Sequence, residues 1–378
     1  MSYQRLFKNV KRGLPYLAKE VRLQITKHTP FFVCRPQIVH LWRQGPCNGR
    51  CIMCWWGFSS PVQREAWLEK SFPTDAIPRI LSQIGDLCGS GTMVSYMSGE
   101  PLLSPAVFDW LKMAADLGLD FRFTTNGYLL DEERARKLVA SKPFNIGVSL
   151  ESLDPVINET LRPVKDGTRK TVQGIELLIA ERKKQNSSMS INIKCTLTQI
   201  NFRSLADIIR RFGQIEGVFI TPQVFEVIPE MPPETVDKLW IRDLDGLKAT
   251  VQEVIALKKA GYAVNVEESV LWGFVRQYEE DPQHVSTISD RKVKSSRGVP
   301  CSIGNSTLFI MSDGGVRLCP HFPAIGNVMT DSATLKQMWY SDTARDVRRQ
   351  IAECRWLCNL SCLRQTSLLH KIKTFLRM

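Results

Sequence analysis

Short apolar runs alternate with amphipathic stretches from residue 36 to about residue 230, and this alternation constrains the fold more than any other feature of the sequence. The strand-like runs span residues 37–42, 92–96, 121–125, 144–150, 190–197 and 218–228. The helical stretches between them span residues 73–84, 105–117, 131–141, 171–184 and 204–212. Strands that alternate with helices favour an α/β fold with a parallel sheet or barrel. Ligands of such folds bind at the carboxyl ends of the strands, so we expect the functional residues in the loops that follow them.

Three cysteines with the spacing C-x3-C-x2-C follow the first predicted strand: Cys47, Cys51 and Cys54. A structural zinc site needs four ligands, and so does a fully ligated iron–sulfur cluster. A 4Fe–4S cluster that is held by three thiolates leaves one iron open to a substrate or cofactor. The spacing therefore favours such a site-differentiated cluster. Another metal would need a fourth ligand, for which Cys34 and His40 are candidates.

A second motif, Ser98-Gly99-Glu100-Pro101, stands where the second predicted strand ends. Glycine allows the backbone to approach a ligand closely, and a carboxylate such as that of Glu100 can accept hydrogen bonds from an ammonium group. The tetrapeptide by itself is also compatible with a plain turn that carries an exposed acid. Its position next to the cysteine motif makes the ligand-binding interpretation the better one.

Together the two motifs resemble those of the radical S-adenosylmethionine (radical SAM) superfamily. In that family the open iron chelates the amino and carboxylate groups of S-adenosylmethionine. Reductive cleavage of the sulfonium then yields methionine and a 5′-deoxyadenosyl radical, which abstracts hydrogen from a substrate. The resemblance implies a (β/α)6 partial TIM barrel, an enzyme of the oxidoreductase or transferase type, and a reductant such as flavodoxin or ferredoxin as a partner.

The resemblance also implies which residues bind S-adenosylmethionine, although it assigns no catalytic acid or base. The expected contacts are Ser98, Gly99, Glu100, Pro101, Met53, Thr125, Asn126, Ser149, Arg162 and Thr196. This chain departs from the family pattern at three positions. Ser98 replaces a glycine, Met53 stands where an aromatic residue is common, and Glu151 replaces an aspartate in the segment Ser-Leu-Asp.

Five further cysteines lie near the C-terminus: Cys301, Cys319, Cys354, Cys358 and Cys362. Residues 308–318 read as a β-hairpin with an Asp313-Gly314 turn that delivers Cys319. The pattern resembles the SPASM or shorter twitch domain, which binds auxiliary 4Fe–4S clusters. We expect one auxiliary cluster, bound by Cys301, Cys319 and two of the other three cysteines, with zinc as the main rival. Which of the three is spare stays open, and Cys34, Cys88 and Cys195 are expected to be ordinary buried thiols.

The sequence suggests five regions and places its positive charge in the two terminal ones. We expect a basic amphipathic extension (1–35), the radical SAM partial barrel (36–232), a helical connector (233–296), a small α+β SPASM/twitch domain (297–365) and a basic tail (366–378). Of the net charge of +12, residues 1–43 contribute +8 and residues 363–378 contribute +4. These ends read either as helices that pack on the enzyme body or as segments that lie on an anionic membrane surface. Binding to nucleic acid is disfavoured, because the positive charge does not extend over the body.

Location and substrate follow from weaker signals. No run approaches 18 apolar residues, the beginning of the chain lacks the apolar core of a secretory signal, and eleven cysteines without such a signal favour a reducing cytoplasm. We expect a cytoplasmic enzyme, with contact at the inner face of the membrane left open. The favoured substrate is a small or lipid-linked molecule. A peptide or protein maturase is the second hypothesis, weakened because no separate leader-binding module is evident before the barrel, and a non-catalytic iron–sulfur or zinc protein is the third.

Overall fold

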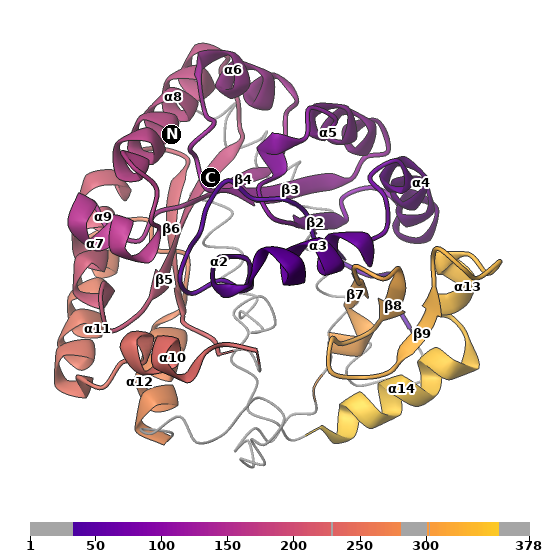
Figure 1. Cartoon of the computed structure of the whole chain (residues 1–378). Helices are drawn as coiled ribbons and strands as arrows, with labels where there is room; N and C mark the ends of the chain where they lie inside the picture. Colours follow the sequence, from indigo (N-terminus) through magenta and orange to yellow (C-terminus); the bar gives the residue numbers. More distant parts are fainter. Residues whose placement is uncertain (1–32, 228–229, 281–300, 302, 355–378) are drawn as a thin grey trace.

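Parallel strands and outer helices form the body of the protein (Figure 1). The computed structural model describes residues 33–227, 230–280, 301 and 303–354. The six parallel strands are β1 (Ile38–Trp42), β2 (Met93–Met97), β3 (Asp120–Thr125), β4 (Asn145–Ser149), β5 (Ser190–Leu197) and β6 (Val218–Val224). They lie side by side in chain order, which is the parallel α/β arrangement that the alternating sequence predicts.

Helices separate the strands in the chain, and most of them cover the outer face of the curved sheet, whereas the two over residues 55–58 and 61–69 lie on the inner side of the arc (Figure 1). They are α2 (Trp55–Phe58), α3 (Pro61–Glu69), α4 (Ala76–Cys88), α5 (Val107–Asp116), α6 (Glu132–Ala140), α7 (Pro155–Leu161), α8 (Gly167–Lys184) and α9 (Leu205–Phe212), with 3-10 turns η1 (Pro101–Leu103) and η2 (Phe202–Ser204). Ile77, Ile80, Leu81 and Ile84 of α4 are fully buried. Their spacing of three and four residues places them on one helical face, which packs on the sheet.

The strands bury one face more deeply than the other. On β3, Phe121, Phe123 and Thr125 are buried, whereas Asp120, Arg122 and Thr124 between them are partly accessible. Because neighbouring residues of a strand point to opposite faces, the apolar residues face the helices and the polar ones line the inner face of the arc. This inner face is polar enough to receive a ligand.

The C-terminal strands continue the same sheet. β7 (Thr307–Ile310) pairs in parallel with β1, and β8 (Gly315–Arg317) and β9 (Ala324–Asn327) follow it in antiparallel pairing. The described strands therefore form a nine-stranded sheet with the order β6-β5-β4-β3-β2-β1-β7-β8-β9. The hairpin expected over 308–318 is present, but it extends the main sheet instead of forming one of its own, a pairing that no local pattern in the sequence could reveal.

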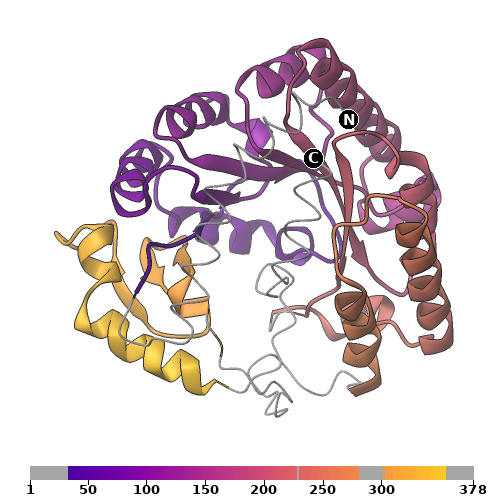
Figure 2. The ribbon, with the colours of Figure 1, turned by 180° about the vertical axis from the view of Figure 1, so that it is seen from behind.

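The remaining helices lie near the two ends of the arc, as the view from behind also shows (Figure 2). α10 (Pro233–Leu239), α11 (Leu244–Lys259) and α12 (Glu268–Glu280) lie near β6, and α13 (Leu335–Trp339) and α14 (Asp342–Glu353) lie near β9, with the turn η3 (Ile303–Asn305) before β7. No helix in the described ranges is long and apolar enough to cross a membrane. The basic ends predicted to pack on the body or a membrane fall largely outside the described residues.

The structure differs from the sequence prediction in several elements. The helix predicted over 73–84 runs from Ala76 to Cys88 and ends at Gly89, whose φ of +68° no β-carbon-bearing residue adopts easily. The strand predicted over 218–228 ends at Val224. The short helices α2, α3 and α7 were not predicted, although Asp154 caps α7 and Pro155 occupies its first turn, which is a recognisable start signal.

Candidate metal and cofactor site

The candidate site lies at the carboxyl edge of the sheet, in the loops that leave β1 to β4. Cys47, Cys51 and Cys54 lie on the loop after β1, and residues 98–101 directly follow β2. Asn126 follows β3, and Glu151 follows β4. Parallel strands end at the same edge, so four segments that are distant in sequence meet there.

The first two thiols of the cysteine loop both lie close to Gly49. A β-carbon placed on Gly49 would lie 3.5 Å from the sulfur of Cys47 and 3.7 Å from that of Cys51. The Gly49 amide donates a hydrogen bond to the Cys47 sulfur at 3.3 Å. A turn in which the Cys54 amide donates to the Cys51 carbonyl at 3.0 Å brings the third cysteine to the start of α2. The three thiols are partly buried, as ligands of a shielded cluster should be.

The donor set fits an iron–sulfur cluster better than a single ion. Burial raises the pKa of the Cys47 thiol to about 11 and also raises that of Cys54, so both thiols are protonated while no metal is bound. Because a metal binds the thiolate form, each would release its proton when the metal binds. No group of three or more His, Cys, Asp or Glu side chains in the described ranges is arranged to hold one metal ion. Each thiolate of a four-iron cluster binds a different iron, so the three sulfurs need not approach one another as closely as the ligands of a single metal ion do. His40, a candidate fourth ligand, instead stacks on Phe309 of β7 with ring centroids 4.7 Å apart.

The cysteine loop packs directly on the motif after β2. The Glu100 amide donates to the Pro46 carbonyl at 2.8 Å. A β-carbon on Gly99 would overlap the carbonyl oxygens of Gly45 and Pro46, so glycine is required there for close packing. The two motifs that carry the family resemblance are thus parts of one site.

Glu100 connects the loops after β2 and β3. Its carboxylate is buried and accepts hydrogen bonds from the Asn126 amide (2.7 Å), the Thr125 hydroxyl (2.8 Å) and the Leu102 amide (3.0 Å). Burial raises the pKa of this carboxyl group, and the same three hydrogen bonds oppose the rise. Glu100 therefore holds the site together through donors of its own chain, and of its roughly four acceptor positions about one, on Oε2, stays available for a ligand.

Asn126 links this edge to the cysteine loop. Its side-chain amide donates to the Asn48 side chain at 2.7 Å and lies 3.9 Å from the Cys47 sulfur. Its carbonyl accepts a hydrogen bond from the Thr171 hydroxyl of α8 at 2.9 Å. Asn126 is thus one of the predicted residues that the structure brings to the thiols.

Arg162 joins the second cysteine of the loop, Cys51, to the loop after β4. Its guanidinium donates to Glu151 at 2.7 and 2.9 Å and lies 3.5 Å from the Cys51 sulfur. Glu151 is fully buried, and its second oxygen accepts from the Thr196 amide at 2.6 Å. Three residues singled out in the sequence, Arg162, Glu151 and Thr196, therefore form one chain of contacts that ends at Cys51.

The positions of the four other predicted contacts say less about how a cofactor would bind. Ser149 ends β4 and is half-buried, and Ser98 packs beside Gly45. Met53 packs against the hydrophobic core. Pro101 is buried at the start of η1.

Sequence reasoning missed some residues that support the site. The Trp56 indole donates to the Cys47 carbonyl at 3.0 Å, and the guanidinium groups of Arg50 and Arg64 lie 5.7 and 5.6 Å from its ring. Tyr128, after β3, is partly buried, and burial raises its pKa to about 12. Trp56 could have been predicted, because it lies two residues after Cys54 in the sequence. Tyr128 could not, because only the folding of the chain brings it close to Arg162.

The C-terminal cysteines are spread over three elements. Cys319 is buried just after β8, Cys301 is exposed before η3, and Cys354 caps the C-terminal end of α14. Arg348 of α14 donates to the Gly304 carbonyl of η3 at 3.0 Å, which joins the segments that carry Cys301 and Cys354. Cys358 and Cys362 lie outside the described residues.

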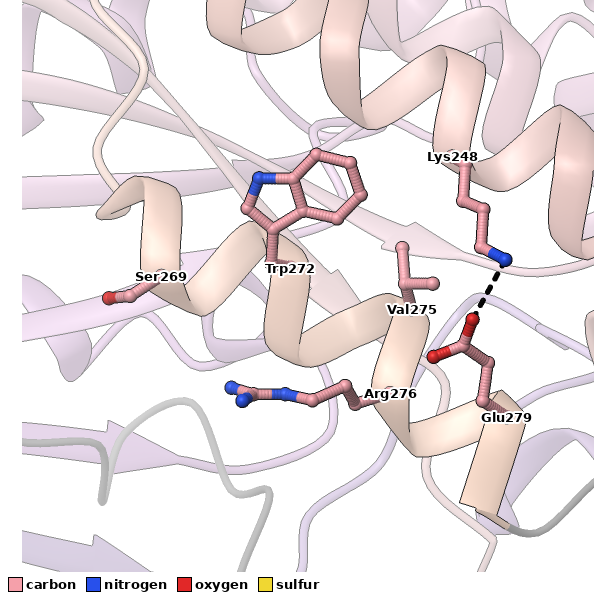
Figure 3. Close-up of a pocket in the computed structure, with 6 residues that line it drawn as sticks. All are labelled: Lys248, Ser269, Trp272, Val275, Arg276 and Glu279. Atoms are coloured by element: carbon pink, nitrogen blue, oxygen red, sulfur yellow. Dashed lines mark ion pairs between the residues drawn. The ribbon is translucent and has the colours of Figure 1, made fainter.

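A surface pocket lies elsewhere, on α11 and α12 (Figure 3). Its lining residues are Lys248, Ser269, Trp272, Val275, Arg276 and Glu279. Lys248 and Glu279 form an ion pair across it at 2.8 Å. It includes none of the residues of the cysteine loop, so it is separate from the candidate site.

Comparison with known proteins agrees with this geometry. A sequence model of the radical SAM superfamily matches residues 44–209, and a model of the SPASM iron–sulfur cluster-binding domain matches residues 301–363. This chain belongs to the radical SAM superfamily. Its cofactors are accordingly S-adenosylmethionine and a 4Fe–4S cluster, and the SPASM domain supports an auxiliary cluster.

Among similar sequences, this radical SAM protein is 22% identical over 317 residues to an AdoMet-dependent heme synthase of Methanosarcina barkeri, covering 83% of this chain and 85% of the relative. An S-adenosylmethionine-dependent nucleotide dehydratase of Lacinutrix mariniflava is 30% identical over 115 residues, which are 30% of this chain and 23% of the dehydratase.

Solved structures share the fold. Streptococcus suis SuiB bound to S-adenosylmethionine aligns with a TM-score of 0.57 at 17% identity, over 83% of this chain and 68% of SuiB. The structure of anSMEcpe with bound AdoMet and the Cp18Cys peptide aligns with a TM-score of 0.53 at 15% identity, over 90% of this chain and 96% of the other. At these identities the likeness concerns the fold alone.

Proposed function

We propose that this protein cleaves S-adenosylmethionine reductively and uses the resulting radical to oxidise a small or lipid-linked molecule or to form a bond in it. The observation that carries the proposal is the packing of the cysteine loop on residues 98–101, with the sulfurs of Cys47 and Cys51 both close to Gly49 of the same loop. The bound cluster and S-adenosylmethionine would supply a 5′-deoxyadenosyl radical, and the protein would bind and orient the substrate.

Each part of the site has a proposed role. Cys47, Cys51 and Cys54 would hold three irons of the cluster. The Arg162 guanidinium beside the Cys51 sulfur would offset part of the charge of the thiolate, and such contacts to sulfur tune the reduction potential of a cluster. Glu100 and Asn126 would fix the loops around S-adenosylmethionine, and Ser98, Gly99, Ser149 and Thr196 lie along the same edge of the sheet.

For the C-terminal region we propose one auxiliary cluster. Cys301 and Cys319 would supply two thiolates, and two of Cys354, Cys358 and Cys362 would supply the others. Four thiolates would also suit zinc. The catalytic unit would be a (β/α)6 partial barrel over residues 36–232, followed by the connector (233–296) and the SPASM/twitch domain (297–365).

The similar proteins support two different kinds of substrate, a small molecule and a peptide. The similarity to a heme synthase extends over 83% of the chain and favours a small-molecule substrate. The structural likeness to SuiB, which has been solved with its precursor peptide SuiA, keeps a peptide maturase as the second candidate. A non-catalytic iron–sulfur or zinc protein would leave the packing of residues 98–101 on the cysteine loop unexplained.

The test is anaerobic reconstitution of the full chain with iron and sulfide, followed by reduction in the presence of S-adenosylmethionine. We expect 5′-deoxyadenosine from the wild type and from Cys88→Ala, a control that removes a buried thiol of α4. We expect none after joint replacement of Cys47, Cys51 and Cys54 by alanine. About eight irons per chain would support two clusters, and about four would leave the C-terminal cysteines to zinc. The non-catalytic alternative requires that no 5′-deoxyadenosine forms from wild type.

Two partners belong to the proposal. An electron donor such as flavodoxin or ferredoxin would reduce the cluster. The basic ends would give peripheral contact with an anionic membrane, which binding to anionic liposomes at low salt would detect. Equal binding after removal of residues 2–27 and 367–378 would exclude a role of these ends.

A further inference from the structure

Three basic side chains share the inner face of the sheet, where the substrate of the proposed function would lie. His40 on β1 pairs in register with Ser95 on β2, and Ser95 pairs with Arg122 on β3. Residues that are paired across parallel strands point to the same face, so His40 and Arg122 are separated only by the small side chain of Ser95.

His40 is buried but lacks the contacts that a buried histidine normally makes. Only 4% of it is exposed, and neither ring nitrogen has a hydrogen-bond partner within the described part of the chain. One side of the ring is covered by Phe309, which fixes its plane. A buried polar group without a partner is costly, and a ligand that supplies the missing hydrogen bond removes this cost.

Arg122 shows the same deficit. Its Nε is buried and has no hydrogen-bond partner among the described residues, while its guanidinium lies 5.6 Å from the centre of the Phe144 ring. The planar guanidinium offers paired donors that match a carboxylate or phosphate. The acid facing Arg122 is Asp120, two residues earlier on the same face of β3, which offsets one of the positive charges.

Lys194 on β5 reaches toward this pair across β4. Its Cε lies 3.3 Å from the point where a β-carbon on Gly147 would stand, and the Thr124 hydroxyl of β3 lies 2.5 Å from the same point. The missing side chain of Gly147 therefore gives Lys194 a path over β4 toward β3. The charges of Lys194 and Arg122 both act on His40, whose pKa is lowered to about 4 by burial and by these two neighbours. His40 is thus neutral at pH 7 and has one ring N–H to donate.

The position of this group suits the far end of a substrate. His40 lies two residues before the end of β1, and Arg122 and Lys194 lie three residues before the ends of β3 and β5. At about 3.3 Å per residue they lie roughly 7 to 10 Å below the edge that carries the cysteine loop. A substrate that reaches the edge with its reacting carbon would place its other end among them.

We propose that His40, Arg122 and Lys194 form an anion-binding site that holds a carboxylate or phosphate group of the substrate. That the bound anion belongs to the substrate rests on the proposed function. The anion site itself can be tested without S-adenosylmethionine or a reductant. It narrows the substrate class to anionic molecules.

The experiment measures binding of succinate, inorganic phosphate and uncharged succinamide to the full chain labelled with 15N-histidine. The His40 signal is assigned by its absence in His40→Phe. We expect succinate or phosphate, but not succinamide, to shift this signal saturably at pH 7, and the tighter of the two anions identifies the preferred group. Lys194→Met and Arg122→Met should each raise the dissociation constant about tenfold, because each removes a charge-assisted contact. Lys183→Met and Arg276→Met, which remove charges outside the inner face, should leave it unchanged.

If Arg122→Met does not fold, Arg122→Lys and Lys194→Gln give the same comparison, with a smaller loss expected for Arg122→Lys because it keeps the charge. Equal binding of succinamide, or unchanged dissociation constants in Lys194→Gln and Arg122→Lys, would overturn the anion site. Failure of the wild type to form 5′-deoxyadenosine would overturn the proposed function but not the anion site.

Discussion

The two cysteine regions of this protein are built on different principles. Cys47, Cys51 and Cys54 lie within eight residues on one loop, and local contacts such as the Gly49 amide to the Cys47 sulfur hold that loop in shape. Cys301, Cys319 and Cys354 lie before η3, after β8 and after α14, so only the packing of these elements can bring them together.

The first region can therefore be recognised from the spacing of its cysteines, whereas the second depends on tertiary structure. The cysteine loop is held partly by contacts within itself, and its other partners are the neighbouring strand ends, Trp56 of α2 and Arg162 at the C-terminal end of α7. The C-terminal region needs β7 to pair with β1 and α14 to pack on η3. The following predictions test whether the two regions are as independent as their construction suggests.

The largest expected effect concerns single cysteines. Cys47→Ala should abolish formation of 5′-deoxyadenosine and remove about four irons per chain, because a cluster left with two thiolates is not retained. Cys319→Ala should lose a similar amount of iron but still cleave S-adenosylmethionine. Iron analysis and chromatographic detection of 5′-deoxyadenosine provide the measurement. Loss of cleavage in Cys319→Ala would show that the two regions act as one unit.

The second prediction compares the arginines that hold each region. Arg162→Met should destabilise the protein by about 3–5 kcal/mol, because it leaves the fully buried Glu151 charged and without its ion-pair partner. Arg348→Met, which removes hydrogen bonds to the carbonyls of Gly304 and Trp339, should cost only about 1–3 kcal/mol. Urea unfolding of the metal-free protein measures both. Adding Glu151→Gln to Arg162→Met should restore part of the loss, and no restoration would refute the ion-pair explanation.

The third prediction concerns the contact between the strands that precede the two cysteine regions, where His40 of β1 stacks on Phe309 of β7. Burial, Arg122 and Lys194 lower the pKa of His40 from 6.5 to about 4. Between these values the unfolded chain binds a proton that the folded chain does not, so stability falls as the pH drops from about 6.5 to about 4. The loss attributable to His40 is about 3 kcal/mol. His40→Phe should weaken this pH dependence of urea unfolding, and an unchanged profile would contradict it.

The smallest expected effects concern two matched helix starts. Ser60 with Gln63 and Thr334 with Gln337 form capping boxes at α3 and α13. Thr334→Ala should cost about 1 kcal/mol of global stability, because α13 buries Leu335, Met338 and Trp339 in the core. Ser60→Ala should change global stability less, because α3 buries no residue, and should instead speed hydrogen exchange within α3. Equal global costs would show that α3 is tied to the core more firmly than its burial indicates.

Much of the site was predictable because its signals are local. The strand ends located the loops, and the residues 98–101 and Asn126 lie where parallel strands must converge. The contacts of Glu151 with Arg162 and Thr196 were only partly foreseen, since each residue was noted separately and their mutual contacts depend on where the loop after β4 meets β5. Tyr128 and the path of Lys194 over Gly147 gave no signal, because they arise from side chains that meet across strands.

The alternation of strands and helices, the position of the ligand-bearing loops after the strands and the three clustered thiols could all be read from the sequence, because hydrophobic periodicity and short spacing act over a few residues. The pairing of β7 with β1 in one continuous sheet and the common inner face of His40, Arg122 and Lys194 are visible only in the folded chain. Both depend on pairing between segments that are far apart in the chain, and the free energy of that pairing comes from burial that no local pattern records.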